Sequence, residues 1–99
     1  MENKNDKLMK AVDLLKILSH PVRLSILCNL YHEGEMSAGA LVDAERGRSS
    51  QSQVSQFLGL MREQGLVTTR KDGQSVYYKI ASSEAAAVIA ALYKVYCKR

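Results

Sequence analysis

A change of hydrophobic period after residue 65 constrains the fold of this chain more than any other feature. Before it, apolar residues follow the i, i+3, i+4, i+7 spacing of an amphipathic helix: Val54, Phe57, Leu58 and Met61. After it, residues typical of strands lie two apart: Val67, Thr69, Val76, Tyr78 and Ile80. Asp72-Gly73 separates the two strand-like runs and is a strong hairpin signal. The sequence therefore predicts a helix followed directly by a β-hairpin.

Four helices are predicted before the hairpin and one after it. The first carries Leu8, Ala11, Leu15 and Leu18, and the second begins at Pro21, with Ser19 as its cap. The others span 36–46 with Ser37 as cap, 50–64 with Ser49 or Ser50 as cap, and 84–97 with Ser82 or Ser83 as cap. Residues 1–6 are polar, so we expect them to be frayed. The 99 residues fit one domain, mainly α with a two-stranded β-hairpin.

Positive charge is concentrated in the second half of the chain. The whole sequence carries a net charge of +4. Residues 21–45 contain one basic and four acidic side chains, whereas residues 46–79 contain six basic and two acidic ones. A basic surface attracts phosphate backbones or anionic membranes. An uneven but merely solvated surface is the alternative that charge alone leaves open.

Residues 36–64 form a candidate helix-turn-helix, with 36–46 as the first helix, 47–49 as the turn and 50–64 as the second helix. The exposed face of the second helix is polar and uncharged, whereas a solvated helix favours Lys and Glu. Gln and Ser side chains have the reach to hydrogen-bond base edges in the major groove. The candidate DNA-reading residues are Ser50, Gln51, Ser52, Gln53, Ser55 and Gln56.

The hairpin adds a second candidate DNA contact. Arg70 and Lys71 lie near its tip, beside Gln74. A basic hairpin that follows a helix-turn-helix is a wing, which can lie along a phosphate backbone or enter the minor groove. The combination predicts a winged helix-turn-helix protein that binds double-stranded DNA.

Four segments resemble the ArsR/SmtB family of winged-helix repressors. Residues 18–27 read LSHPVRLSIL, similar to the family's opening L-x-H/D-P-x-R-L-x-I-L, and residues 50–58 read SQSQVSQFL, similar to its recognition helix. Residues 62–67 (REQGLV) and 73–78 (GQSVYY) resemble the helix exit and the wing. Phe57 stands where the family often has His, and the stretch 43–49 is about two residues longer than usual. The resemblance implies a homodimeric repressor that binds an inverted-repeat operator.

The cysteine, histidine and acidic residues of the sequence bear on what effector the protein senses. The metal sensors of this family use Cys-x-Cys on the third helix or acid and His clusters on the last, and this sequence has neither pattern. Cys28 and Cys97 instead resemble the dithiol of the sulfide- and redox-responsive branch, the BigR, SqrR, YgaV and HlyU-like regulators. The implied effector is a persulfide, polysulfide or other oxidant, with no cofactor and no metal. A metal-responsive repressor stays open, as do two structural cysteines.

The last predicted helix is apolar on every side, so it must be covered by more than its own domain. We expect a second copy of the chain to cover it, together with the first helix. The predicted dimer-interface residues are Leu8, Leu15, Val88, Ile89 and Leu92.

Other classes of protein fit less well. The chain has no catalytic Ser-His-Asp or Cys-His pattern and no phosphate-binding loop, so we expect no enzyme. It has no signal-like segment and no apolar run of membrane-spanning length, which predicts a cytoplasmic protein with no membrane partner. A winged helix that binds another protein, rather than DNA, remains an alternative.

Overall fold

The computed structural model describes residues 4–97. Helix α1 (Lys4–Leu18) is followed by α2 (Pro21–Glu33) after a two-residue break. The expectation that residues up to 6 are frayed is wrong for 4–6, which are helical; Asp6 in the first turn suits the positive end of the helix dipole. Residues 1–3 lie outside the described residues.

The cap of α2 differs from the prediction. His20, in extended conformation, places Nδ1 3.2 Å from the backbone N of Val22 and accepts its hydrogen bond. The Ser19 hydroxyl instead donates to the carbonyl of Lys16, 2.8 Å away, at the end of α1. Ser19 therefore closes the preceding helix and His20 begins the next one.

Helices α3 (Ala38–Ala44) and α4 (Gln51–Glu63) form the helix-turn-helix. Ser37 and Ser50 cap them as predicted, each accepting a hydrogen bond from a backbone amide three residues on, at 3.1 Å. Helix α3 is shorter than predicted at both ends. Met36 and Ser37 are in a strand, and residues 45–49 form the turn to α4.

The sheet has three antiparallel strands, not two. Strands β2 (Val67–Asp72) and β3 (Ser75–Ile80) form the predicted hairpin, and β1 (Met36–Ser37) pairs with the other edge of β3 through Met36–Tyr78 and Ser37–Tyr77. A two-residue strand carries no periodic signal in a sequence. Gly73 opens the hairpin loop with φ of 64°, a conformation that side chains disfavour.

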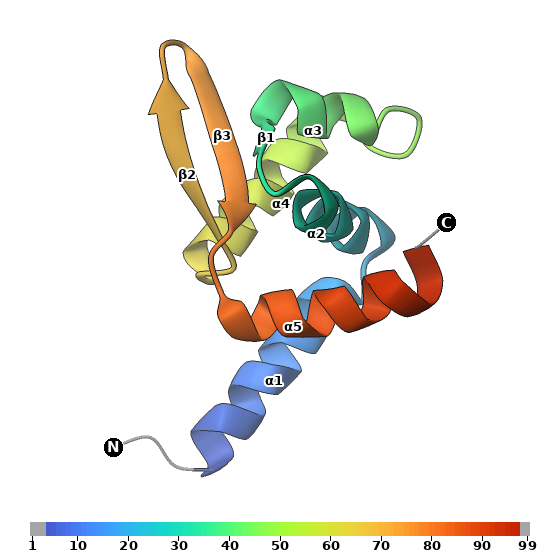
Figure 1. Cartoon of the computed structure of the whole chain (residues 1–99), viewed down its shortest axis with the longest axis vertical. Coiled ribbons are helices and arrows are strands. Elements are labelled where there is room, and N and C mark those ends of the chain that lie inside the picture. The colour runs from blue at the N-terminus through green and yellow to red at the C-terminus, as the bar shows by residue number, and fades with distance from the viewer. Residues whose placement is uncertain (1–3, 98–99) are drawn as a thin grey trace.

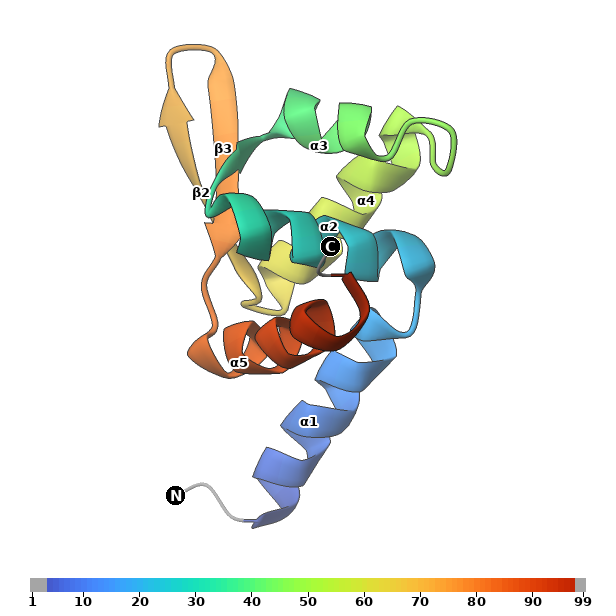
Figure 2. The same cartoon turned by 45° about the vertical axis from the view of Figure 1, so that its right-hand side comes forward.

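The last helix changes character before it ends. Ser82 caps α5 (Ser83–Leu92), which continues as a π-helical turn, η1 (Tyr93–Cys97), where the sequence predicts one α-helix to residue 97. Figure 2 shows this C-terminal turn beside α2. The continuation places the C-terminal end of the helix against the middle of the domain.

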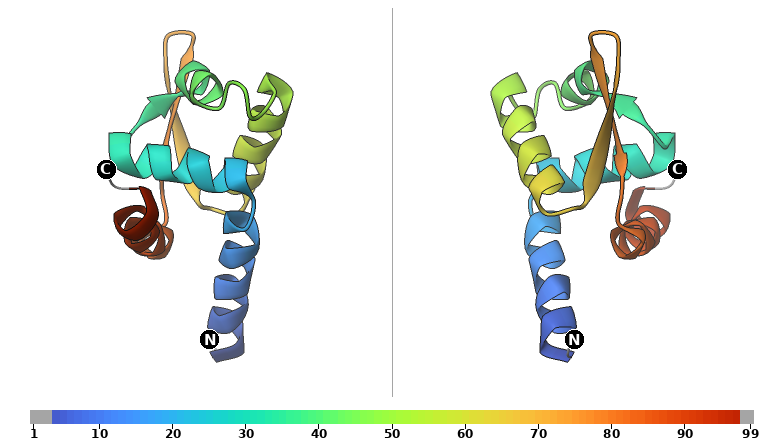
Figure 3. Two further views of the ribbon diagram at one scale, coloured as in Figure 1. Left: turned by 90° about the vertical axis from the view of Figure 1, so that its right-hand side faces the viewer. Right: turned by 90° about the vertical axis from the view of Figure 1, so that its left-hand side faces the viewer.

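The core lies between α2, α4, α5 and the base of the hairpin (Figure 1). Its largest fully buried apolar side chains are Ile26, Leu27, Leu30, Leu41, Val54, Met61 and Ile89. Figure 3 shows that α1 projects from one end of this body, whereas the hairpin loop and the start of α4 lie at the opposite end. The fold therefore separates a helix-turn-helix end from an α1–α5 end.

Candidate nucleic-acid interface and cysteine positions

The N-terminal half of α4 presents most of the predicted DNA-reading residues to solvent. Gln51, Ser52, Ser55 and Gln56 are exposed, while Val54, Leu58 and Met61 face the core. The structure thus brings the four polar side chains to one exposed face, at the end of the molecule that also carries the hairpin loop (Figure 3).

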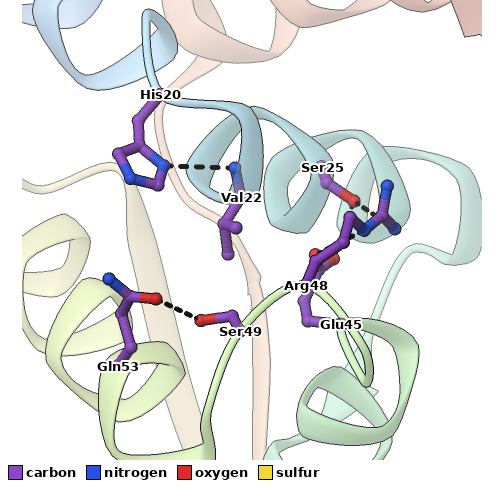
Figure 4. A network of polar contacts seen from close by, with 7 residues as sticks. All are labelled: His20, Val22, Ser25, Glu45, Arg48, Ser49 and Gln53. Carbon is purple, nitrogen blue, oxygen red and sulfur yellow. Dashed lines mark hydrogen bonds and ion pairs between the residues drawn. The ribbon is translucent and has the colours of Figure 1, made fainter.

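Two other predicted residues on this helix hold the helix itself. The Ser50 hydroxyl is engaged as the N-cap, and the half-buried Gln53 accepts a hydrogen bond from the Ser49 hydroxyl at 2.7 Å (Figure 4). Both contacts fix the first turn of α4 to the turn before it. Ser50 and Gln53 therefore stabilise the start of α4, whereas the other four side chains are free to contact a ligand in solvent.

Two basic residues of the wing, Arg70 and Lys71, have different surroundings. Arg70 is bound at the side of the hairpin: its guanidinium donates to both carboxylate oxygens of Glu35, at 2.8 and 2.9 Å, and lies 4.5 Å from the centre of the Tyr77 ring. Lys71 and Gln74 are exposed beside the loop. The hydrogen bond from Arg70 lowers the pKa of Glu35, and the same bond raises the pKa of Arg70.

The residue noted as unusual for the family, Phe57, is a packing residue here. Its half-buried ring meets the ring of His20 edge-on at 4.7 Å between centres, and the Arg23 guanidinium lies 5.2 Å from its centre. Phe57 thereby joins the middle of α4 to the start of α2.

The turn between α3 and α4 contains a buried carboxylate that the sequence did not reveal. Glu45 is completely buried, and one of its oxygens accepts a hydrogen bond from the Ser25 hydroxyl of α2 at 2.7 Å. Arg48 approaches the other oxygen, with Nε 3.6 Å away. The hint in the sequence is Arg48, an opposite charge three residues after Glu45 and just before the cap of α4.

The two cysteines lie on elements that contact each other. Cys28 is buried in the middle of α2, and Cys97 is the last residue of η1. Tyr93, at the start of η1, shares a 2.8 Å hydrogen bond with Nδ1 of His32 and stacks on its ring, with 5.5 Å between centres. The Tyr31 ring lies 5.5 Å from the Tyr93 ring on the same side. The Cys97 side chain lies outside the described part of the structure.

The predicted dimer residues fall into two groups. Leu8 and Leu15 on α1 are 62% and 59% exposed, Val88 on α5 is 37% exposed, and Leu92 is half-buried. Ile89 is 0% exposed within a single chain. The assignment of Ile89 to the interface is therefore corrected, because this side chain fills the core of its own domain. A groove between α1 and α5 is lined by Leu14, Ile17 and Val88 among others.

The chain is similar along most of its length to known regulators. It is 45% identical over 89 residues to the transcriptional activator HlyU of Vibrio cholerae, covering 90% of this chain and 80% of that protein. It is 38% identical over 96 residues to the biofilm growth-associated repressor of Xylella fastidiosa, covering 97% of this chain and 82% of that protein. No family model matches the chain.

A solved structure agrees with the sequence relatives. Reduced HlyU from Vibrio cholerae matches the fold with a TM-score of 0.83 at 42% identity, covering 95% of this chain and 96% of that one. The chain belongs to the ArsR/SmtB-like winged-helix transcriptional regulators. This regulator is therefore a DNA-binding protein and, like its relatives, not an enzyme.

None of the helices within residues 4–97 is long and apolar enough to cross a membrane. Nor do three or more His, Cys, Asp or Glu side chains gather there as metal ligands would.

Proposed function

We propose that this regulator is a homodimeric repressor whose operator binding is relieved when oxidation or persulfidation joins Cys28 to Cys97. The observation that carries the proposal is the contact between the two cysteine-bearing elements, through Tyr93 of η1 and His32 of α2. Cys28 lies about one helical turn before His32, and Cys97 about one turn after Tyr93. One of the solved relatives is described as reduced HlyU, and a distinct reduced form is what the proposal requires.

DNA reading is assigned to the exposed face of α4, with the wing on an adjacent phosphate backbone. Gln51, Ser52, Ser55 and Gln56 reach base edges, since the N-terminal residues of a recognition helix lie in the major groove. Lys71 and Gln74 contact the backbone outside it. The position of both elements at one end of the molecule supports this arrangement (Figures 1 and 3).

The dimer is assigned to the opposite end of the molecule. Leu8 and Leu15 on α1, with Val88 and Leu92 on α5, offer an apolar surface that a second copy would remove from water. A two-fold axis through this end leaves both recognition helices outward, as an inverted-repeat operator requires.

The redox step uses both thiols and a persulfide donor. One cysteine thiolate attacks the outer sulfur of the donor, so that a cysteine persulfide forms and the donor leaves as its thiol. The second thiolate attacks the inner sulfur of that persulfide, forming the Cys28–Cys97 disulfide and releasing hydrogen sulfide. Two thiols and one persulfide thus give one disulfide, one thiol and one hydrogen sulfide. A bridge that retains sulfur would be heavier by each sulfur kept.

The bridge would act on DNA through α2. This helix contacts α5, and η1 through the hydrogen bond between His32 and Tyr93, and it holds the α3–α4 turn through Ser25 and Glu45. A covalent tie between α2 and η1 could therefore change the spacing of the two recognition helices. A coupling free energy of about 1–3 kcal/mol lowers DNA affinity by roughly 5- to 150-fold, which is enough for induction.

The deciding experiment measures operator binding with and without a persulfide donor, with intact mass recorded on the same samples. We expect loss of affinity in step with the mass change of a bridged chain. Cys28→Ser and Cys97→Ser proteins should bind DNA as the wild type does and ignore the donor. Full operator affinity in a sample whose mass shows the bridge would contradict the proposal. Release of DNA by zinc or arsenite, without any response to persulfide, would favour a metal-responsive repressor instead.

A further inference from the structure

The α3–α4 turn encloses a charge that DNA reading by α4 does not itself explain. Among the residues that the structure describes, Glu45 is the buried charged side chain, at 0% exposure. A buried carboxylate is costly unless hydrogen bonds and an opposite charge compensate it. Its burial at the turn that leads into the recognition helix therefore calls for a role.

Glu45 is held from two sides. Oε2 accepts the hydrogen bond of the Ser25 hydroxyl at 2.7 Å, whereas Oε1 receives no hydrogen bond within the described residues and faces Nε of Arg48 at 3.6 Å. Arg48 also donates from Nη2 to the Ser25 oxygen at 3.4 Å. Figure 4 shows the three side chains converging between α2 and the turn. The carboxylate thus tethers the guanidinium through its Nε side.

Arg48 remains open towards solvent. Its side chain is 60% exposed, while Glu45 behind it is shielded from water. The backbone around it is fixed, because the amides of Arg48 and Ser49 both donate to the Glu45 carbonyl, at 2.9 and 3.0 Å. Arg48 lies two residues before Ser50, the cap of α4, so its backbone borders the N-terminus of that helix.

The other arginines near this end are paired with carboxylates that stay in contact with solvent. Arg70 of the wing is bound bidentately by Glu35, and Arg46 is paired with Asp43, both on the molecular surface. Arg48 differs because its partner is buried and approaches from one side. Its outward N–H groups keep the fork geometry that binds a phosphate oxygen pair.

We propose that Arg48 is a phosphate-contact residue of the DNA interface and that the buried Glu45 is its positioning residue. The proposal rests on the proposed reading of DNA by α4, since Arg48 borders the N-terminus of that helix. It extends the interface from the reading face and wing to a third element, the α3–α4 turn.

The test compares the loss of one positive charge just before α4 with the loss of one positive charge near the end of α4. Arg48→Gln should weaken binding to operator and to unrelated duplex by the same factor. It should also reduce the slope of log affinity against log salt by about 1, the loss of one phosphate contact. Arg62→Gln removes the same charge near the other end of α4, where Arg62 is exposed, and should leave the slope unchanged.

The positioning role is tested by a double-substitution cycle on DNA affinity. Glu45→Gln removes a negative charge near DNA, which by itself would raise affinity. If Glu45 holds Arg48, Glu45→Gln should instead lower affinity several-fold in the wild-type background. In the Arg48→Gln background only the charge effect remains, so the same substitution should not lower affinity there. The double variant leaves no buried charge unpaired, so it still gives the salt slope if Arg48→Gln alone fails to fold.

Three outcomes separate the possibilities. An Arg48→Gln or double variant, folded by circular dichroism, that keeps the wild-type salt slope shows that Arg48 touches no phosphate. A Glu45→Gln protein that gains affinity equally in both backgrounds shows that Glu45 acts only as a repelling charge. A wild-type protein that binds no duplex at all refutes the proposed function of α4, and the inference with it.

Discussion

The hydroxyl of Tyr93 and Nδ1 of His32 lie 2.8 Å apart and join the C-terminal turn of the chain to the end of α2. The contact is reinforced by stacking of the two rings, with an angle of 19° between their planes. It holds η1, which ends at Cys97, against the helix that carries Cys28. Closure of a bridge between the two thiols should therefore depend on it.

Tyr93→Phe should slow formation of the Cys28–Cys97 bridge. A net hydrogen-bond contribution of about 0.5–1.5 kcal/mol corresponds to a roughly 2- to 12-fold smaller population of the docked turn. The rate is followed by intact mass after addition of a persulfide donor. Tyr96→Phe removes the same atom from a side chain that is 80% exposed on the same turn, so it should leave the rate unchanged. If Tyr93→Phe and Tyr96→Phe form the bridge at the same rate, the His32–Tyr93 hydrogen bond does not contribute to bridge formation.

Base reading should divide the polar residues of α4 into two kinds. Replacing Gln51, Ser52 or Gln56 by Ala should cost roughly 1–3 kcal/mol where the residue contacts a base, and should relax the preference at that base. Ser50→Ala should instead lower the free energy of unfolding by about 1 kcal/mol, because it removes the cap of α4, and should weaken all operators alike. Affinities for a set of single-base operator variants, with thermal melts, distinguish the two. An unchanged operator ranking for all three glutamine and serine variants would exclude α4 as the reader.

The local signals of this fold were readable because they depend on neighbours in sequence. Ser37, Ser50 and Ser82 cap helices as predicted, and Asp72-Gly73 marks the hairpin, since caps and turns need only a few consecutive residues. Strand β1 and the buried Glu45 depend instead on residues far away in sequence. Strand β1 forms by pairing with Tyr78, and Glu45 is held by Ser25. Both features follow from tertiary packing, which the periodicity of apolar residues in the sequence does not reveal.

The candidate site was predictable to a similar depth. The exposed reading face of α4 follows from the stripe of Val54, Leu58 and Met61 on its other side. The capture of Arg70 by Glu35 could not be foreseen, because the two residues are 35 positions apart and meet only after β1 pairs with β3. An all-apolar helix does not reveal which side faces its own core, so the sequence alone cannot separate Ile89 from the interface residues.

The wing should depend on Lys71 more than on Arg70. Arg70 must leave Glu35 and Tyr77 before it can bind a phosphate, whereas Lys71 is exposed. Lys71→Ala should therefore flatten the salt dependence of DNA binding by about 1 in slope, and Arg70→Ala by less. Glu35→Gln should increase the contribution of Arg70, seen as a steeper slope that disappears when Arg70 is also replaced. Titrations between about 50 and 200 mM salt measure all four proteins. A larger effect of Arg70→Ala in the wild-type background would contradict this order.

The ion pair between Glu35 and Arg70 should make the stability of the domain depend on pH in the acidic range. The pKa of Glu35 is lowered from its ordinary value of 4.5, chiefly by the hydrogen bond from Arg70. A lowered folded-state pKa gives a stabilising contribution that is present above 4.5 and is lost as pH falls through the lower value. The difference in urea midpoint between wild type and Glu35→Gln should therefore be constant at neutral pH and shrink as pH falls below 4.5. A difference that grows on acidification would have the wrong sign for this ion pair.

The two apolar faces of the α1–α5 end should respond differently to a charge. Leu8→Glu or Leu15→Glu changes a side chain that is exposed in one chain, so the domain should fold and the dimer should dissociate. Ile89→Glu places a charge in the core and should unfold the domain, because the carboxylate would be buried without a partner. Light scattering gives the mass in solution, and circular dichroism reports folding of the same samples. Lys7→Glu on the same helix is the control for added negative charge and should stay dimeric if Leu8 and Leu15 are the buried residues. A folded Leu8→Glu, Leu15→Glu double variant that retains the mass of a dimer would place the interface on another surface.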